Sequence, residues 1–326
     1  MHEATLVEAV NLALAHELEA DASVVVIGED VGANGGVFRA TANLQARFGS
    51  RRVRDTPLSE ALIAGMAIGM AAQGLRPVAE IQFMGFIYPT IDQMLNHAAR
   101  LRNRTRGRLS VPMVLRAPFG GGIHAPEHHS ESSEALFAQI PGLRLVIPSS
   151  PQRAYGLLLA AIRDPDPVVF LEPKRIYRLL TQELEDDGEA LPLDSCFLLR
   201  EGSDCTLVSW GAMTHECLAA ADELAQQGLS IEVIDVACLK PIDMESILQS
   251  IAKTGRCVIV HEAPRSCGVG AEIAAGIAEK GLLHLLAPIQ RVTGYDTVMP
   301  LFRLEQCYLP DQQTIVDAVL KTLEFS

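Results

Sequence analysis

Asp55-Thr56-Pro57-Leu58-Ser59-Glu60 is followed at once by an almost wholly apolar segment, Ala61–Ala72. Pro57 ends the preceding strand, Ser59 suits the N-cap of a helix, and Glu60 falls in the first turn, where the helix dipole favours an anion. The apolar residues after Glu60 predict a helix that is buried on nearly every side. A carboxylate at the head of such a helix is costly to bury without a partner, so it is either a cap residue or a functional acid.

Composition and charge narrow the class of protein. The chain has 326 residues, 48% hydrophobic and 21% charged, which is typical of a globular protein of about two domains. A net charge of −13 argues against nucleic acid or an anionic membrane as a partner. The seven cysteines all lie at or after Cys196 and form no Cys-x-x-Cys pair, which favours a reduced compartment. With no signal peptide and no membrane-spanning run, we expect a cytoplasmic protein or a mature chain.

The order of short apolar runs and helical segments predicts the fold class. Continuous runs such as Val24–Ile27 are typical of buried parallel strands, and helical patterns separate them. We therefore expect an α/β fold of two domains, each a mostly parallel sheet flanked by helices. An acidic, polar stretch near the middle predicts a linker at residues 182–198, between domains at residues 1–181 and 199–326.

The end of the first buried strand carries a second acidic candidate. Val24–Ile27 runs into Gly28-Glu29-Asp30-Val31-Gly32. Ligands of open α/β sheets gather at the carboxyl ends of strands, which places Glu29 within reach of a site. A loop with acidic helix-cap residues is the alternative.

A glycine-rich loop carries three histidines, His124, His128 and His129, within residues 120–132. Zinc binding is poorly supported, because His128 and His129 are adjacent and no fourth soft ligand lies at ligand spacing. A histidine that transfers a proton beside a reactive ligand fits better, since imidazole titrates near neutral pH. A structural loop with surface histidines remains the alternative.

The motifs together resemble one family, in order and over essentially the whole chain. They are Gly28-Glu29-Asp30-Val31-Gly32, Asp55-Thr56-Pro57-Leu58-Ser59-Glu60, Glu80-Ile81-Gln82-Phe83 and His129-Ser130-Glu131-Ser132. The sequence is similar to β subunits of the thiamine-diphosphate-dependent decarboxylating component of 2-oxo acid dehydrogenase complexes, above all of pyruvate dehydrogenase. The resemblance implies a transketolase-like pyrimidine-binding domain followed by a transketolase C-terminal-like domain.

The resemblance also implies roles for single residues. Glu60 is similar to the glutamate that shares a proton with the cofactor's aminopyrimidine, and His129 to a histidine that handles protons when the acyl group passes to a lipoyl arm. These are the candidate catalytic residues. The cofactor-binding positions are Glu29, Leu58, Glu60, Gln82 and Phe86, and a potassium-binding loop through backbone oxygens is implied at Met113, Ala161, Ile162, Asp164 and Asp166.

The family works as an α₂β₂ heterotetramer that docks a lipoyl acyltransferase core. Its diphosphate is held through Mg²⁺ by a Gly-Asp-Gly segment, which this sequence lacks and which the family carries on the α subunit. The resemblance thus implies thiamine diphosphate shared between subunits, with Mg²⁺ on α and, in some members, K⁺ on β. A branched-chain 2-oxo acid or acetoin dehydrogenase β subunit, and a non-catalytic scaffold, are the alternatives.

Overall fold

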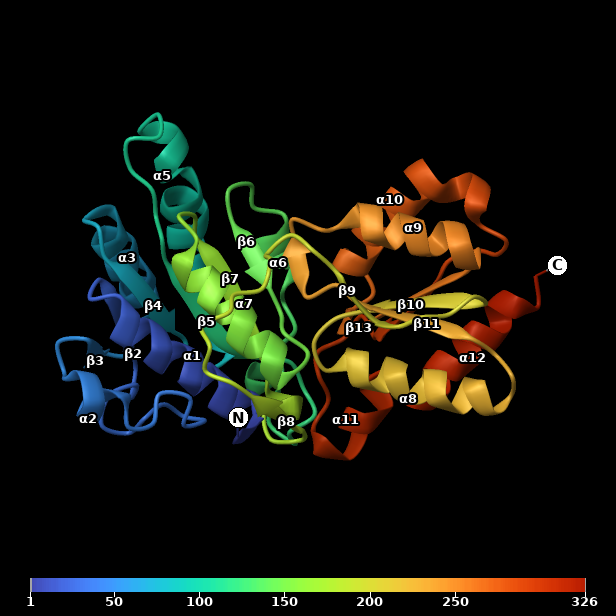
Figure 1. The fold of residues 1–326 in the computed structure, drawn as a ribbon, viewed down its shortest axis with the longest axis horizontal. Helices are drawn as coiled ribbons and strands as arrows, with labels where there is room; N and C mark the ends of the chain where they lie inside the picture. The colour runs from blue at the N-terminus through green and yellow to red at the C-terminus, as the bar shows by residue number, and fades with distance from the viewer. Residues whose placement is uncertain (1, 326) are drawn as a thin grey trace. The chain divides into compact units, whose positions relative to one another are not determined.

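The computed structural model describes residues 2–325 and separates into two compact units. The first unit holds the chain up to Phe119 together with Leu136–Leu193, and the second holds Gly120–Ala135 and the chain from Asp194 onward. Each unit contains a sheet with helices packed against it (Figure 1). The sequence places the histidine-rich loop inside a continuous first domain. The structure groups it with the second unit, because the loop is bonded to residues of that unit.

Parallel strands form the main sheet of the first unit. They lie in the order β6-β7-β5-β4-β2-β3, and each neighbouring pair is parallel. The strands are β2 (Val24–Gly28), β3 (Val53–Asp55), β4 (Arg76–Glu80), β5 (Val114–Phe119), β6 (Arg144–Val146) and β7 (Val168–Pro173). An antiparallel pair, β1 (His2–Thr5) with β8 (Thr181–Leu184), lies apart from this sheet. Every residue of β2, β5 and β7 is buried, which explains their continuous apolar runs.

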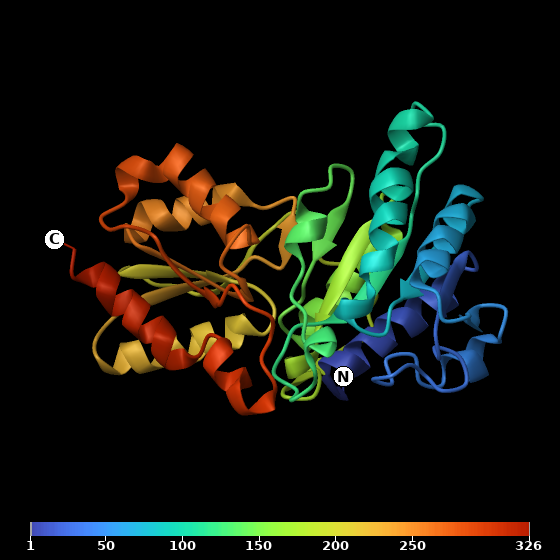
Figure 2. The ribbon, with the colours of Figure 1, turned by 180° about the vertical axis from the view of Figure 1, so that it is seen from behind.

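Helices cover the sheet of the first unit. They are α1 (Leu6–Ala20), α2 (Leu44–Phe48), α3 (Glu60–Ala72), α4 (Ile91–Gln93), α5 (Ala99–Arg104), α6 (Ala135–Ala138) and α7 (Pro151–Arg163). Short 3₁₀ helices are η1 (Met84–Phe86), η2 (Tyr88–Thr90) and η5 (Lys174–Ile176), and η3 (Met94–Ala98) is a π-helix. The helix α1 packs on α7 at the front of Figure 1, whereas α3 and α5 lie in front in Figure 2. The sheet is therefore covered on both faces.

The helix α3 begins at Glu60, as the sequence predicts, but its burial differs from the prediction. The buried face is formed by Ile63, Ala64, Ala67, Ile68 and Ala71. On the other side, Leu62 is 48% exposed, and a Cβ added at Gly69 would meet no described atom within 4 Å. The prediction that α3 is buried on nearly every side is therefore wrong for this chain. The helix is apolar all round, but the fold covers only one face.

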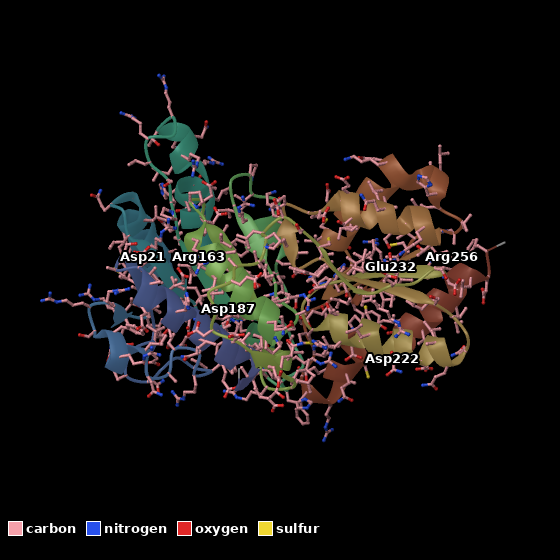
Figure 3. All side chains as sticks on the ribbon, viewed as in Figure 1. Asp21, Arg163, Asp187, Asp222, Glu232 and Arg256 are labelled. Atoms are coloured by element: carbon pink, nitrogen blue, oxygen red, sulfur yellow. The ribbon has the colours of Figure 1, made fainter. Side chains whose placement is uncertain are left out.

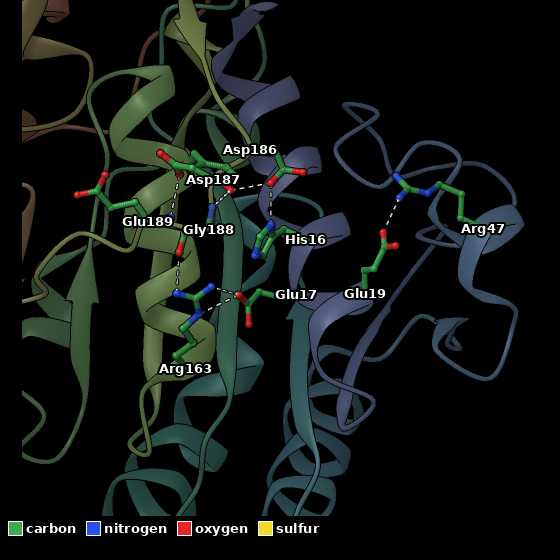
Figure 4. Close-up of polar contacts among 10 residues, drawn as sticks. His16, Glu17, Glu19, Arg47, Arg163, Asp186, Asp187, Gly188 and Glu189 are labelled. Carbon is green, nitrogen blue, oxygen red and sulfur yellow. Dashed lines mark hydrogen bonds and ion pairs between the residues drawn. The ribbon is translucent and has the colours of Figure 1, made fainter. Parts of the chain in front are cut away.

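Polar contacts tie the acidic segment after β8 to the first unit (Figure 4). Arg163, at the end of α7, donates to Glu17 of α1 at 2.7 and 2.9 Å and to the carbonyl of Gly188 at 2.9 Å. His16 Nδ1 lies 2.7 Å from Asp186 Oδ1. The stretch expected to act as a linker is thus bonded to α1 and α7 over at least part of its length.

The second unit repeats the α/β arrangement on a smaller sheet of order β14-β13-β10-β11-β9, in which only β9 runs antiparallel. Its strands are β9 (Phe197–Arg200), β10 (Cys205–Ser209), β11 (Ile231–Asp235), β13 (Cys257–Pro264) and β14 (Gln290–Gly294), and a short strand β12 (Cys238–Lys240) follows β11. This confirms the predicted fold class for both halves of the chain.

Four of the five α-helices described in the second unit lie in two pairs. The five are α8 (Met213–Gln226), α9 (Met244–Thr254), α10 (Val269–Gly281), α11 (Phe302–Tyr308) and α12 (Gln312–Leu323), with turns η4 (Glu127–His129) and η6 (Leu282–His284). α8 packs with α12 and α9 with α10, on opposite faces of the sheet (Figure 1). Arg256, labelled in Figure 3, donates from Nε to the carbonyl of Thr322 at 3.1 Å and so ties α12 to the start of β13. None of the helices within residues 2–325 is both long and apolar enough to cross a membrane.

Candidate functional site

Two acidic candidates meet at the carboxyl edge of the first sheet. Glu29 directly follows β2, and Glu60 opens α3 directly after β3 and a short connecting turn. Both side chains are half-buried. Burial, the charge of Asp30 and the charge of Glu60, in that order, raise the pKa of Glu29. The two carboxylates are therefore close enough to interact, as groups that share one polar ligand would be.

The other cofactor candidates follow β4 or precede α3. Gln82 Nε2 lies 3.5 Å from Asp30 Oδ2, beside Glu29. Phe86, in η1, is half-buried and packs edge-on against Phe83 with ring centroids 5.9 Å apart. Leu58 precedes α3 and is 72% exposed. The first unit thus offers carboxylates, an amide and an aromatic edge around one end of the sheet, with an uncovered leucine nearby.

The first unit also holds a buried ionic cluster that sequence reasoning missed. Arg116 of β5 donates from Nε and Nη2 to the two oxygens of Glu172 at 2.6 and 2.9 Å, and from Nη1 to Glu80 at the end of β4. The Tyr177 hydroxyl donates to Glu172 Oε2 at 2.5 Å. All four side chains are at most 4% exposed. The sequence does carry a signal for this cluster: Glu80, Arg116 and Glu172 are charged residues within otherwise apolar strands. Because a buried charge requires a partner, they could have been predicted to pair.

An aromatic row joins this ionic cluster to Phe86. The Tyr177 ring lies 5.2 Å from Phe38, which lies 5.4 Å from Phe83, the neighbour of Phe86. Burial above all, and the charge of Glu172, raise the pKa of Tyr177 well above its usual value, so its hydroxyl stays a donor. The row gives Phe86 a fixed packing partner.

The histidine loop lies in the second unit. The two ends of the loop are joined by a hydrogen bond from the Gly120 N–H to the carbonyl of Glu131 at 2.9 Å. His128 and His129 both lie in η4, where His128 is exposed and His129 half-buried. His124 is exposed and lies at φ +59°. Within the described residues, no group of three or more His, Cys, Asp or Glu side chains is placed to hold a metal ion.

The loop expected to bind potassium is already occupied by a protein cation. The expected ligands are the backbone oxygens of Met113, Ala161, Ile162, Asp164 and Asp166. Arg76 Nη1 donates to the carbonyls of Ile162 and Asp164 at 2.8 and 3.3 Å, and the Met113 carbonyl accepts from the Val168 N–H at 2.9 Å. Three of the five expected oxygens, those of Met113, Ile162 and Asp164, already accept from protein donors, so they fit a K⁺ ion poorly. The K⁺ site stays a prediction.

Comparisons with known proteins agree with this architecture. Residues 2–179 match the family described as transketolase, pyrimidine binding domain, and residues 195–315 match transketolase, C-terminal domain. A solved chain described as a split-gene transketolase in an inactive β4 tetramer has a TM-score of 0.82 at 23% identity and covers 99% of both chains. That likeness shows the fold.

Curated relatives at higher identity define the family more narrowly. A pyruvate dehydrogenase E1 component subunit β from Acholeplasma laidlawii is 50% identical over 317 residues, 97% of each chain. Its counterpart from Bacillus subtilis is 46% identical over 325 residues, 100% of each chain. The chain therefore belongs to the family of pyruvate dehydrogenase E1 component β subunits, built from a transketolase pyrimidine-binding domain and a transketolase C-terminal domain.

Proposed function

We propose that the chain is the β subunit of a pyruvate dehydrogenase complex. With a separate α subunit it catalyses thiamine-diphosphate-dependent oxidative decarboxylation of a 2-oxo acid and reductive acylation of lipoyl groups. The observation that carries this proposal is Glu60, which opens α3 beside Glu29 in the unit that matches a pyrimidine-binding family. The names of the full-length relatives support pyruvate as the substrate.

The residues at the edge of the first sheet fit an aminopyrimidine. When bound, thiamine diphosphate supplies a nucleophilic carbon and an electron sink for decarboxylation. Glu60 would hold a proton at the pyrimidine ring, with Glu29 ordering the same polar groups. Phe86 offers an aromatic surface and Leu58 an apolar one, and Gln82 is held beside Glu29 through Asp30. Polar groups at one end of a largely apolar pocket fix the orientation of a flat heterocycle.

The open face of α3 supports the proposal that a partner subunit binds there. Leu58 is 72% and Leu62 48% exposed, and Gly69 on the same helix faces open space in the described chain. An apolar helix face without a cover is typical of a protein interface. We propose that the α subunit covers it in an α₂β₂ assembly and supplies the Mg²⁺ site, for which this sequence has no Gly-Asp-Gly segment.

The second unit completes the proposal. His129, in its loop, would handle protons during acyl transfer to the lipoyl group, and the unit would dock the acyltransferase core. The proposed domains are residues 1–181 and 199–326, joined by residues 182–198, with residues 120–135 of the first segment grouped with the second unit. The cytoplasm is the proposed location, supported by cysteines that are all free thiols, among them the buried Cys205, Cys217 and Cys257.

The test is Glu60→Gln, assembled with the matching α subunit. Decarboxylation of pyruvate is expected to fall about 100-fold or more, because the proton at the pyrimidine loses its carboxylate partner. The matched control is Glu272→Gln, which changes an exposed acid in the first turn of α10 and should leave turnover unchanged. Size-exclusion chromatography with light scattering checks that both variants assemble.

Near-normal turnover of the Glu60→Gln enzyme would refute the role given to this residue. Calorimetric titration of thiamine diphosphate, with and without the α subunit, separates an enzyme subunit from a scaffold. Binding that needs both chains supports the shared site. Assembly with the α subunit, but no binding of the cofactor, would support the scaffold instead.

A further inference from the structure

The entry to the histidine loop is bonded to one buried carboxylate, Glu305 of α11. Glu305 Oε1 accepts from the Gly122 N–H at 2.8 Å. The His124 N–H lies 3.3 and 3.1 Å from Oε1 and Oε2, and His124 Nδ1 lies 2.8 Å from Oε2. The Glu305 side chain is 2% exposed, whereas that of His124 is 61% exposed. One carboxylate therefore serves two backbone donors and one imidazole of the same loop.

This arrangement stabilises a backbone shape that the loop would not hold alone. Gly122 lies at φ +84° and His124 at φ +59°, in the left-handed region that a non-glycine residue seldom adopts. Such a backbone conformation is kept only when the surrounding contacts hold it in place. The backbone N–H groups on which Glu305 acts belong to these same two residues. The carboxylate thus fixes the loop where its backbone is least favourable.

Glu305 is itself held rigidly. It lies on α11, whose Tyr308 packs with Met299 and Leu309 in a buried apolar cluster. Met299 also lies against the loop, since a Cβ at Gly121 would come within 2.5 Å of the methionine methyl group. The carboxylate is therefore attached to packed structure and acts as a fixed anchor.

A second buried carboxylate holds the other end of the loop. Ser132 Oγ donates to Glu262 Oε1 at 3.0 Å, and Glu262 lies at the end of β13. Gly120 passes so close to Glu262 that a Cβ there would collide with the carboxylate. The turn η4, with His129, lies between the two anchored ends. The position of His129 therefore depends on groups far away in the sequence.

We propose that Glu305 is a positioning residue, which fixes the entry of the histidine loop and thereby the place of the His129 imidazole during acyl transfer. This inference rests on the proposed function for its catalytic part, because His129 matters only if the lipoyl group is acylated at this site. Glu305 acts through the loop backbone and His124. A displacement of a catalytic group by about 1 Å can cost up to 100-fold in rate.

The first test needs the purified chain alone. Glu305→Ala removes all the acceptors, and Glu305→Gln keeps the shape and one acceptor oxygen but loses the charge opposite His124. Hydrogen exchange at the Gly122 and His124 amides is expected to accelerate about tenfold in Glu305→Ala and less in Glu305→Gln. Exchange in β13 should stay as in the wild type. The control is Gln306→Ala, an exposed change on the same helix.

The second test uses the assembled α₂β₂ enzyme. Two activities are compared: decarboxylation with a small artificial electron acceptor, and acyl transfer to an isolated lipoyl domain. For Glu305→Gln, kcat/KM for the lipoyl domain is expected to fall about tenfold, with decarboxylation changed about twofold or less. A residue that merely stabilised the fold would lower both activities together.

The outcomes separate this proposal from the function it rests on. Unchanged amide exchange in both Glu305 variants overturns the anchor. Faster exchange with equal loss, or no loss, of the two activities overturns the positioning role in acyl transfer. A wild-type pair without activity toward any 2-oxo acid overturns the proposed function and the catalytic part of this inference, while hydrogen exchange still decides whether Glu305 anchors the loop.

Discussion

Arg116 and Glu172 form a two-pronged ion pair inside the first unit, with Nε to Oε1 at 2.6 Å and Nη2 to Oε2 at 2.9 Å. The third guanidinium nitrogen donates to Glu80, so one cation serves two buried carboxylates. Burial above all raises the pKa of Glu80, although the charge of Arg116 opposes that shift. Glu80 ends β4, shortly before Gln82 and Phe86, two of the residues proposed to hold the pyrimidine.

Arg116→Met is expected to destabilise the chain by about 3 to 5 kcal/mol, because it leaves two buried carboxylates without their cation. Urea unfolding followed by circular dichroism measures the loss. The control is Glu19→Gln, which removes the exposed ion pair with Arg47 in Figure 4 and should cost at most about 1 kcal/mol. Equal midpoints for Arg116→Met and the wild type would show that the cluster adds nothing to stability.

Glu134 should make stability depend on pH. Burial above all, helped by the charge of Glu262, raises the pKa of Glu134 to about 8, from 4.5 in an unfolded chain. Between these values the folded chain holds a proton that the unfolded chain releases. Stability therefore falls as the pH rises through this interval, by at most about 1.4 kcal/mol per pH unit, and levels off above it.

Glu134→Gln carries no titrating group and should flatten this dependence. Urea midpoints at about pH 5 and about pH 8 give the comparison. Glu127→Gln, an exposed change in the histidine loop, is the control and should keep the wild-type slope. A slope that survives in Glu134→Gln would assign it to another group.

Gly69→Leu should separate folding of the chain from assembly. A Cβ at Gly69 meets no described atom within 4 Å, and leucine favours a helix over glycine by up to about 1 kcal/mol. The isolated chain should therefore melt at or above the wild-type temperature. Co-purification with the α subunit should be lost, because the bulk lies on the proposed interface. Ala225→Leu, on an exposed position of α8, is the control, and normal assembly of Gly69→Leu would remove α3 from the interface.

Arg76 should make the first unit insensitive to potassium. Its guanidinium donates to the carbonyls of Ile162 and Asp164, so the wild-type melting temperature should be the same in potassium chloride and choline chloride at equal ionic strength. Arg76→Ala should be less stable by about 1 kcal/mol, since two partly buried carbonyls lose their donor. Arg47→Ala is the exposed control. A potassium-specific rise in the wild type would restore the cation site to this loop.

Much of the fold follows from local patterns in the sequence. The apolar run Val24–Ile27 predicted the buried parallel strand β2, and Ser59-Glu60 before an apolar segment predicted where α3 begins. Glu29 and Glu60 were both indicated as candidates, and the structure brings them within electrostatic reach of each other. The strands and the start of α3 depend on residues that are neighbours in the chain. The candidate acids follow the carboxyl ends of strands, so their positions can be read from the order of the sequence.

The sequence by itself determined the α/β architecture, the family and the candidate acids. Only the tertiary structure decided which face of α3 stays open, which cation lies on the Ile162 carbonyl, and that residues 120–135 join the second unit. These outcomes depend on partners far apart in the sequence, such as Gly122 and Glu305. The free-energy cost of burying a charge or a backbone donor depends on whether a partner group lies within hydrogen-bonding distance. That partner is brought into place only when the chain folds.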